Sequence, residues 1–123
     1  MCELLISEEF VTAYGRSGQP LRAQVERRLG QLVADPTHPS LRVHRIEAHP
    51  NKWECYVNRT HRIIFERIGD VICLWKFGPH SIIDRIERTT FSPYTTFRRV
   101  ASADAVPTAA AYDGPADHIV VAE

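Results

Sequence analysis

The stretch that decides the fold is residues 53–80, which read WECYVNRTHRIIFERIGDVICLWKFGPH. Three short apolar runs at 53–57, 62–68 and 71–77 are separated by turn residues at 58–61 and by the pair Gly69-Asp70. Runs rich in β-branched and aromatic residues between such turns are typical of strands, and a two-residue loop with glycine is typical of a hairpin. We therefore predict an antiparallel β-meander over these residues.

The residues before the meander predict one strand and two helices. An apolar run at 3–6 favours a strand, and Ser7 followed by two acidic residues is a helix start signal for a helix that ends near Tyr14. A second helix is predicted from Gln19-Pro20 to about Asp35, with one apolar stripe. We also predict a strand over 41–46, a turn at 49–52 and a short closing helix over 81–87. The apolar stripe of the second helix consists of Leu21, Val25, Leu29, Leu32 and Val33.

The chain of 123 residues has the length of one domain. We assign residues 1–88 to that domain and residues 89–123 to a C-terminal extension, because Ala, Thr, Ser, Pro and Asp dominate the later part. From about residue 100 this composition favours a partly flexible tail. The last residues could instead add a strand or dock on a partner.

Composition narrows the class of protein. The apolar content is 44% and the formal net charge is zero, so no general attraction to nucleic acid is expected. The three cysteines show no C-x-x-C spacing, which favours reduced thiols in a cytoplasmic protein. No signal peptide or membrane-spanning run is expected. No histidine or cysteine spacing indicates a metal site, and we expect no cofactor.

The Gly69-Asp70 loop predicts how the last two strands of the meander pair. Pairing Ile68 with Val71 would place Ile64 opposite Trp75 and Arg62 opposite Phe77. Alternation then gives one face that the helices cover, made of Ile63, Phe65, Ile72 and Leu74. The other face is expected to be open and to carry Arg62, Ile64, Trp75 and Phe77. An arginine among aromatic rings on such a face is suited to holding a phosphate and stacking a base.

The turn at 58–61 leaves two registers open for the preceding strand. With an odd loop, Cys55 faces Ile63, so that Trp53 and Val57 join the core and Glu54 and Tyr56 lie beside Arg62. With an even loop, Trp53 and Val57 lie beside Arg62 instead. We favour the odd register because it buries more apolar surface.

Three segments together resemble the RelE/ParE superfamily of toxin–antitoxin toxins, in particular its RelE-like branch. They are the DPTHPSLRV segment at 35–43, WECYVNRTHRIIF at 53–65 and LWKFGPH at 74–80, and the likeness covers about residues 1–88. The resemblance implies an α+β fold, in which an N-terminal strand and a helical hairpin pack on an antiparallel β-meander, followed by a short C-terminal helix and tail. Ser81 stands where many members carry an acid.

The resemblance also implies a metal-independent mRNA endoribonuclease. Arg62 would bind the scissile phosphate and His80, just after the last strand, would act as the acid, because histidine exchanges protons near neutral pH. Glu54 is the expected base, with His61 or His44 as substitutes. Further RNA contacts are expected from the following set: Arg45, His44, Tyr56, Arg59, His61 and Trp75.

The family resemblance implies particular partners and leaves alternatives. The expected partners are a cognate antitoxin protein, mRNA and the ribosome, with no membrane. A non-enzymatic ParE-like gyrase inhibitor, or a non-toxic binding domain of the same fold, would share the architecture without cleaving RNA. The alternative to phosphate binding by Arg62 is a structural role, as a surface ion pair with Glu54 or Glu66. The alternative to acid catalysis by His80 is a structural role in the turn, where its side chain would bind backbone groups.

Overall fold

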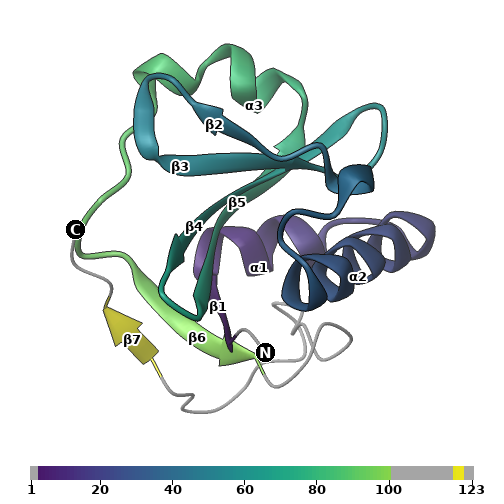
Figure 1. Ribbon diagram of the computed structural model, residues 1–123, viewed down its shortest axis with the longest axis horizontal. Coiled ribbons are helices and arrows are strands. Elements are labelled where there is room, and N and C mark those ends of the chain that lie inside the picture. The colour runs from purple at the N-terminus through teal and green to yellow at the C-terminus, as the bar shows by residue number, and fades with distance from the viewer. Residues whose placement is uncertain (1–2, 101–117, 121–123) are drawn as a thin grey trace.

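The computed structural model describes residues 3–100 and the backbone of 118–120 (Figure 1). Within this part the chain forms one mixed sheet of seven strands in the order β2-β3-β4-β5-β1-β6-β7. The strands are β1 (Glu3–Ser7), β2 (His44–Ile46), β3 (His49–Tyr56), β4 (His61–Ile68), β5 (Val71–Pro79), β6 (Thr96–Val100) and β7 (His118–Val120). The helices are α1 (Glu8–Gly15), α2 (Gln19–Ala34) and α3 (Ser81–Asp84), with short 3₁₀ turns η1 (Pro39–Leu41) and η2 (Ile86–Arg88). The α+β class is confirmed.

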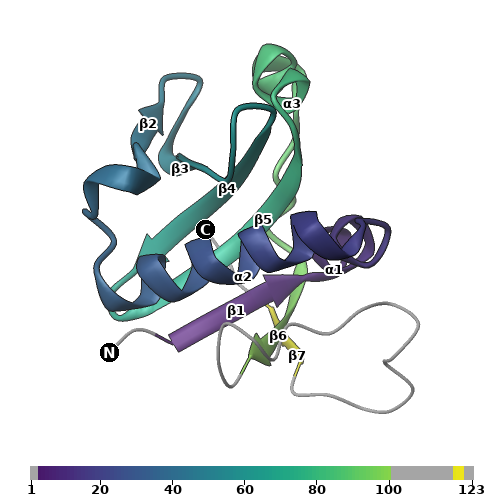
Figure 2. The same cartoon turned by 90° about the vertical axis from the view of Figure 1, so that its right-hand side faces the viewer.

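The helical hairpin covers one face of the sheet (Figure 2). Ser7 caps α1, since its Oγ accepts a hydrogen bond from the Phe10 amide at 3.1 Å. At the far end of the hairpin, Asp35 takes an extended conformation before Pro36 and ends α2, as the proline predicts. The core beneath the hairpin includes the four residues predicted for that face: Ile63, Phe65, Ile72 and Leu74.

The odd register of β3 on β4 is confirmed. Cys55 pairs with Ile63 and Tyr56 pairs with Arg62, so Cys55 and Val57 belong to the helix-covered core. The Gly69-Asp70 hairpin is confirmed as well, with Ile68 paired to Val71. Gly69 has φ of 58°, which glycine adopts without a steric penalty.

The predicted pairings Ile64–Trp75 and Arg62–Phe77 are wrong, because the ladder shifts between Ile64 and Phe65. Phe65 pairs with Leu74 and Ile64 pairs with Lys76, so Trp75 is an extra residue in β5. Such a bulge moves every later side chain of the strand to the other face. Phe77 therefore lies under the helices, with its ring 5.6 Å from that of Phe10, and Gly78 stands opposite Arg62.

The second face of the sheet is not open over its whole length, which corrects the prediction for Trp75. Its side chain is 3% exposed, and its indole N–H donates to Glu66 Oε1 at 3.1 Å. Glu66 also pairs with the buried ammonium of Lys52 at 3.0 Å. Trp75 cannot stack a base from this position. The cover comes from the segment after β5 and from β6, through Ile82, Ile83, Ile86, Phe91 and Phe97.

Three local boundaries differ from the predictions. The strand predicted over 41–46 is shorter, because Leu41 closes η1 and Arg42 is left-handed, so β2 begins only at His44. The predicted turn at 49–52 belongs to β3, which begins at His49. The predicted closing helix over 81–87 takes the form of α3 followed by η2.

The C-terminal extension contributes strands to the sheet. β6 pairs antiparallel with β1, and β7 pairs antiparallel with β6. The division of the chain at residue 88 stays a prediction. The predicted flexible tail falls mostly on 101–117 and 121–123, outside the described residues.

The Ser7 hydroxyl joins α1 to β5, and its removal should destabilise the fold. Its Oγ donates to the Trp75 carbonyl at 2.7 Å while it accepts from the Phe10 amide. We expect Ser7→Ala to lower the free energy of unfolding by about 1–2 kcal/mol, as for loss of a helix cap. Urea denaturation measures this effect. The control Ser81→Ala, at an exposed position, should change stability by less than about 0.5 kcal/mol, and equal losses in both variants would contradict this role.

Candidate active site

A small polar pocket lies where β2, β3 and β4 meet the end of β5. Its volume is about 180 Å³. It gathers the three residues for which catalysis is expected, together with two expected RNA contacts and two residues that were not expected. The lining residues are Arg42, His44, Glu54, Cys55, Tyr56, Arg62 and His80.

The strand register and the preceding turn position Arg62. Because Tyr56 stands opposite it on β3, the guanidinium lies over the phenol ring, with Cζ 4.4 Å from the ring centroid. Nη1 donates to the carbonyls of Asn58 at 2.7 Å and His61 at 3.0 Å. Among the described residues Arg62 forms no ion pair with Glu54 or Glu66. The backbone thus orients the guanidinium while its positive charge remains available to an anion.

His80 reaches the pocket because β5 is held against the start of β4. Its backbone N–H donates to the Thr60 carbonyl at 2.6 Å, one residue beyond the pairing of His61 with Pro79. The exposed imidazole forms no capping bond to α3. The main chain therefore holds His80 in place without occupying the ring nitrogens.

Glu54 contributes a carboxylate with one unsatisfied oxygen. Its side chain is 16% exposed, and Oε1 lies 3.8 Å from His44 Nε2 on the paired strand. Oε2 is buried and has no hydrogen-bond partner among the described residues. A buried acceptor without a donor is energetically costly, and such groups are found at functional sites. Glu54 is thus prepared to accept a proton or a hydrogen bond from a ligand.

Arg42 and Cys55 also line the pocket, although neither was expected there. Arg42 follows η1 with φ of 48° and ψ of 51°, and its Cζ lies 4.8 Å from the Tyr56 ring centroid. In the sequence it appears only as part of the 35–43 segment quoted for the family resemblance, since a left-handed arginine leaves no pattern. Burial raises the pKa of the Cys55 thiol to about 12. The thiol therefore stays protonated and does not act as a nucleophile.

Four of the expected site residues do not line this pocket. Arg45 lies over the ring of Trp53, with Cζ 5.0 Å from the centroid, and Arg59 is exposed in the turn. His61 packs on Phe77 with ring centroids 5.7 Å apart. The fourth is Trp75, which is buried on the covered face. His44 and Tyr56 do line the pocket, as expected.

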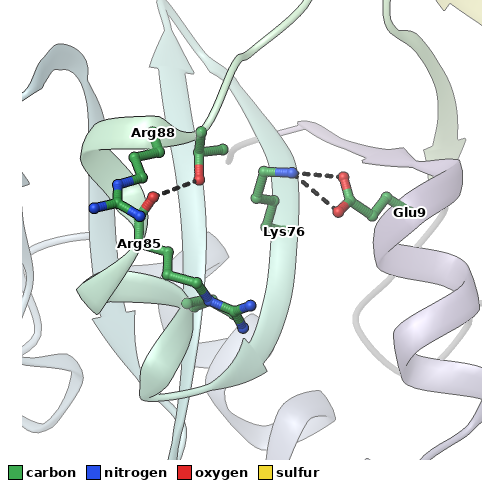
Figure 3. A pocket seen from close by; sticks show the side chains of 6 residues that line it. Glu9, Lys76, Arg85 and Arg88 are labelled. Carbon is green, nitrogen blue, oxygen red and sulfur yellow. Dashed lines mark hydrogen bonds and ion pairs between the residues drawn. The ribbon is translucent and has the colours of Figure 1, made fainter.

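A larger pocket of about 310 Å³ lies between α1 and the segment after β5 (Figure 3). Its lysine and its glutamate are already bound to each other. Lys76 Nζ is bound to both carboxylate oxygens of Glu9, at 2.9 and 2.7 Å. In the close view Arg88 extends away from Lys76, and the Arg85 guanidinium lies below the lysine. The chemistry therefore favours the smaller pocket over the larger one.

Comparisons with known proteins give two solved structures of similar fold. One is the copper-bound crystal structure of a mutant toxin from Helicobacter pylori, with 17% identity and a TM-score of 0.48, covering 66% of this chain and 97% of that one. The other is the solution structure of a conserved hypothetical protein from the same organism, with 16% identity, a TM-score of 0.41 and the same coverage. No protein-family model and no curated protein matches the chain. Likenesses of this degree concern the fold alone.

No group of three or more His, Cys, Asp or Glu side chains is placed to hold a metal ion in the described part of the chain. None of the helices between residues 3 and 100 has the length and apolar character that crossing a membrane requires.

The charge of Arg62 should be measurable through its neighbour His61. Burial, and then the positive charge of Arg62, lower the pKa of His61. Replacing Arg62 with Met removes only the second cause, so the pKa of His61 should rise but stay below its ordinary value. NMR titration of the His61 ring protons measures the shift. Arg59→Ala should leave this pKa unchanged, and an unchanged or lower pKa in Arg62→Met would contradict the assigned proximity.

Proposed function

We propose that this chain is an mRNA endoribonuclease toxin of RelE-like fold, neutralised by a cognate antitoxin. The observation that carries the proposal is the Glu54 carboxylate, which has a buried, unpartnered oxygen among the described residues and lines the same pocket as Arg62 and His80. Cleavage of RNA through its 2′-hydroxyl needs a proton acceptor, a cation and a proton donor around one phosphate. The pocket combines one candidate for each of these roles.

In this mechanism the 2′-hydroxyl attacks the adjacent phosphorus. Glu54 takes the proton of the hydroxyl as the bond from O2′ to phosphorus forms. Arg62 binds the non-bridging oxygens and stabilises the charge that develops on them. His80, in its protonated form, donates a proton to the 5′-oxygen as the bond from phosphorus to that oxygen breaks. The products are a 2′,3′-cyclic phosphate and a free 5′-hydroxyl, and no metal or redox partner is needed for the balance.

The remaining residues of the pocket position these groups. Tyr56 contacts the guanidinium groups of both Arg42 and Arg62, which brings two positive charges to one ring. His44 lies on the Oε1 side of Glu54 and leaves Oε2 available for the 2′-hydroxyl. His44 is therefore a positioning residue in this proposal, and Glu54 is the base.

The charge of the chain supports delivery of the mRNA by the ribosome. Non-specific binding to RNA depends on neutralising many phosphates with basic residues. Here the formal net charge is zero, so capture of free RNA from solution would be weak. A ribosome that holds the mRNA in an extended form would replace this missing attraction. The proposed partners are thus ribosome-bound mRNA and, in the silenced state, the antitoxin.

Three single substitutions test the proposed roles. On purified ribosomes programmed with mRNA, we expect Glu54→Gln and His80→Ala each to reduce the cleavage rate by roughly 10²- to 10⁴-fold. Arg62→Ala should cause a comparable loss, since it removes the charge that stabilises the phosphate. Primer extension on the mRNA measures cleavage, and thermal melting checks the fold.

The exposed Arg67 provides a matched control, because it carries the same charge on the same strand but does not line the pocket. Arg67→Ala should cleave at nearly the wild-type rate. Wild-type rates in the three pocket variants would refute the assigned site. Growth arrest without any mRNA cleavage by the wild-type chain would refute the nuclease itself and favour a gyrase inhibitor.

A further inference from the structure

The size of the pocket around Arg62 limits what it can hold. At about 180 Å³ it is smaller than the roughly 300–1,000 Å³ of pockets that enclose whole small ligands. A phosphodiester linkage fits in this space, whereas the nucleosides on either side of it do not. If the proposed function holds, at least one flanking base must lie on a neighbouring surface.

A second pocket of about 380 Å³ adjoins the first and shares one residue with it. The shared residue is Arg42, which lines both. The remaining lining comes from the segment between α2 and β2 and from Trp53 on β3. These residues are Pro36, Thr37, His38, Pro39, Val43 and Trp53. The volume is within the range that encloses a nucleoside.

The side chains of this second pocket are those that bind a base. Trp53 is half-buried, lines this pocket and carries the Arg45 guanidinium over its ring, with Cζ 5.0 Å from the centroid. His38 uses Nδ1 to bind Ser40, at 3.2 Å to the amide and 2.7 Å to the hydroxyl. Its Nε2 remains available to a ligand. An apolar pocket with a few polar groups and one aromatic wall suits a nucleobase.

Arg42 connects the two pockets through an unusual backbone conformation. Left-handed backbone is rare for residues other than glycine, asparagine and aspartate, and Arg42 adopts it immediately after η1. This conformation brings the side chain against Tyr56, at the boundary between the pockets. A guanidinium in this position can bind the phosphate or sugar that links a base in one pocket to the cleaved bond in the other.

We propose that the pocket of Trp53 and His38 binds the nucleobase next to the cleaved linkage, and that Arg42 holds the backbone between them. The pocket thereby sets the base preference at one position beside the cut. This inference rests on the proposed endoribonuclease activity. A side chain of a bound antitoxin is the competing occupant of the same pocket.

The test uses ribosomes programmed with mRNAs that differ by one nucleotide at each position around the cut. Thr37→Phe should fill the pocket from an exposed position, and Trp53→Leu should remove the aromatic surface. Each should lower kcat/KM for the preferred mRNA roughly ten- to hundredfold, which is the worth of one stacked base. Each should also level the preference among the four bases at one flanking position. Trp53→Phe should restore most of the preference because it restores an aromatic ring.

Two controls separate this inference from the activity on which it rests. Arg67→Ala, at an exposed position near the other end of β4, should keep both the rate and the base preference. If Thr37→Phe and Trp53→Leu cleave with wild-type rate and preference, the pocket does not bind a base, although the nuclease assignment stands. If they cleave normally but escape inhibition by the antitoxin, the pocket binds protein and the inference is wrong. Absence of cleavage by the wild-type chain overturns both proposals.

Discussion

The pairing of β4 with its two neighbours is the constraint on which the rest of the structure depends. On one side, the register with β3 places Tyr56 and Glu54 on the same face as Arg62. On the other side, pairing with β5 continues to Pro79, and the bond from the His80 amide to the Thr60 carbonyl holds His80 at the pocket that Arg62 also lines. A slip of one residue in either ladder would move the affected strand's side chains to the helix-covered face. Backbone hydrogen bonds therefore set the positions of the polar groups.

The bulge at Trp75 divides the second face of the sheet into two parts. Before the bulge, the side chains of β5 alternate as the hairpin predicts, and Trp75 is buried with Glu66 and Lys52. After it, Phe77 turns toward the helices, and glycine follows opposite Arg62. A Cβ at Gly78 would lie 3.0 Å from the side chain of Ile82, so α3 packs closely there. One end of this face is thus covered by apolar residues, while the other keeps polar groups accessible.

The parts of the fold that the sequence predicts are those with local causes. The cap at Ser7, the end of α2 before Pro36 and the Gly69-Asp70 hairpin each follow from a residue's own conformational preference. The odd register of β3 follows from burial of Cys55 and Val57. The bulge leaves no mark in the sequence, because an apolar run reads the same with or without an extra residue. The left-handed Arg42 and the pairing of β6 with β1 depend on tertiary contacts that no local pattern reveals.

The candidate site was predictable to a similar extent and for similar reasons. Glu54 and Arg62 line one pocket because the β3 register, which is readable from the sequence, places them on one face. His80 joins them through the pairing of His61 with Pro79, which follows from the bulge. The prediction that Trp75 is exposed is wrong, because it takes the second face of the sheet as open. Residues later in the chain cover that face at Trp75. Arg42 was missed because its position results from the turn after η1 and not from a strand pattern. Backbone contacts position the polar groups to which the proposed chemistry is assigned. Their side chains remain able to bind a ligand.

The most direct measurement of the central claim is cleavage of an mRNA whose scissile 5′-oxygen is replaced by sulfur. A thiolate leaves without protonation more easily than an alkoxide, since a thiol has a pKa of about 8.5. The account predicts that His80→Ala cleaves this substrate nearly as fast as the wild-type chain, whereas Glu54→Gln stays slow because the 2′-hydroxyl still needs a base. If both variants cleave the sulfur substrate equally slowly relative to the wild-type chain, the assignment of acid and base in this pocket is contradicted.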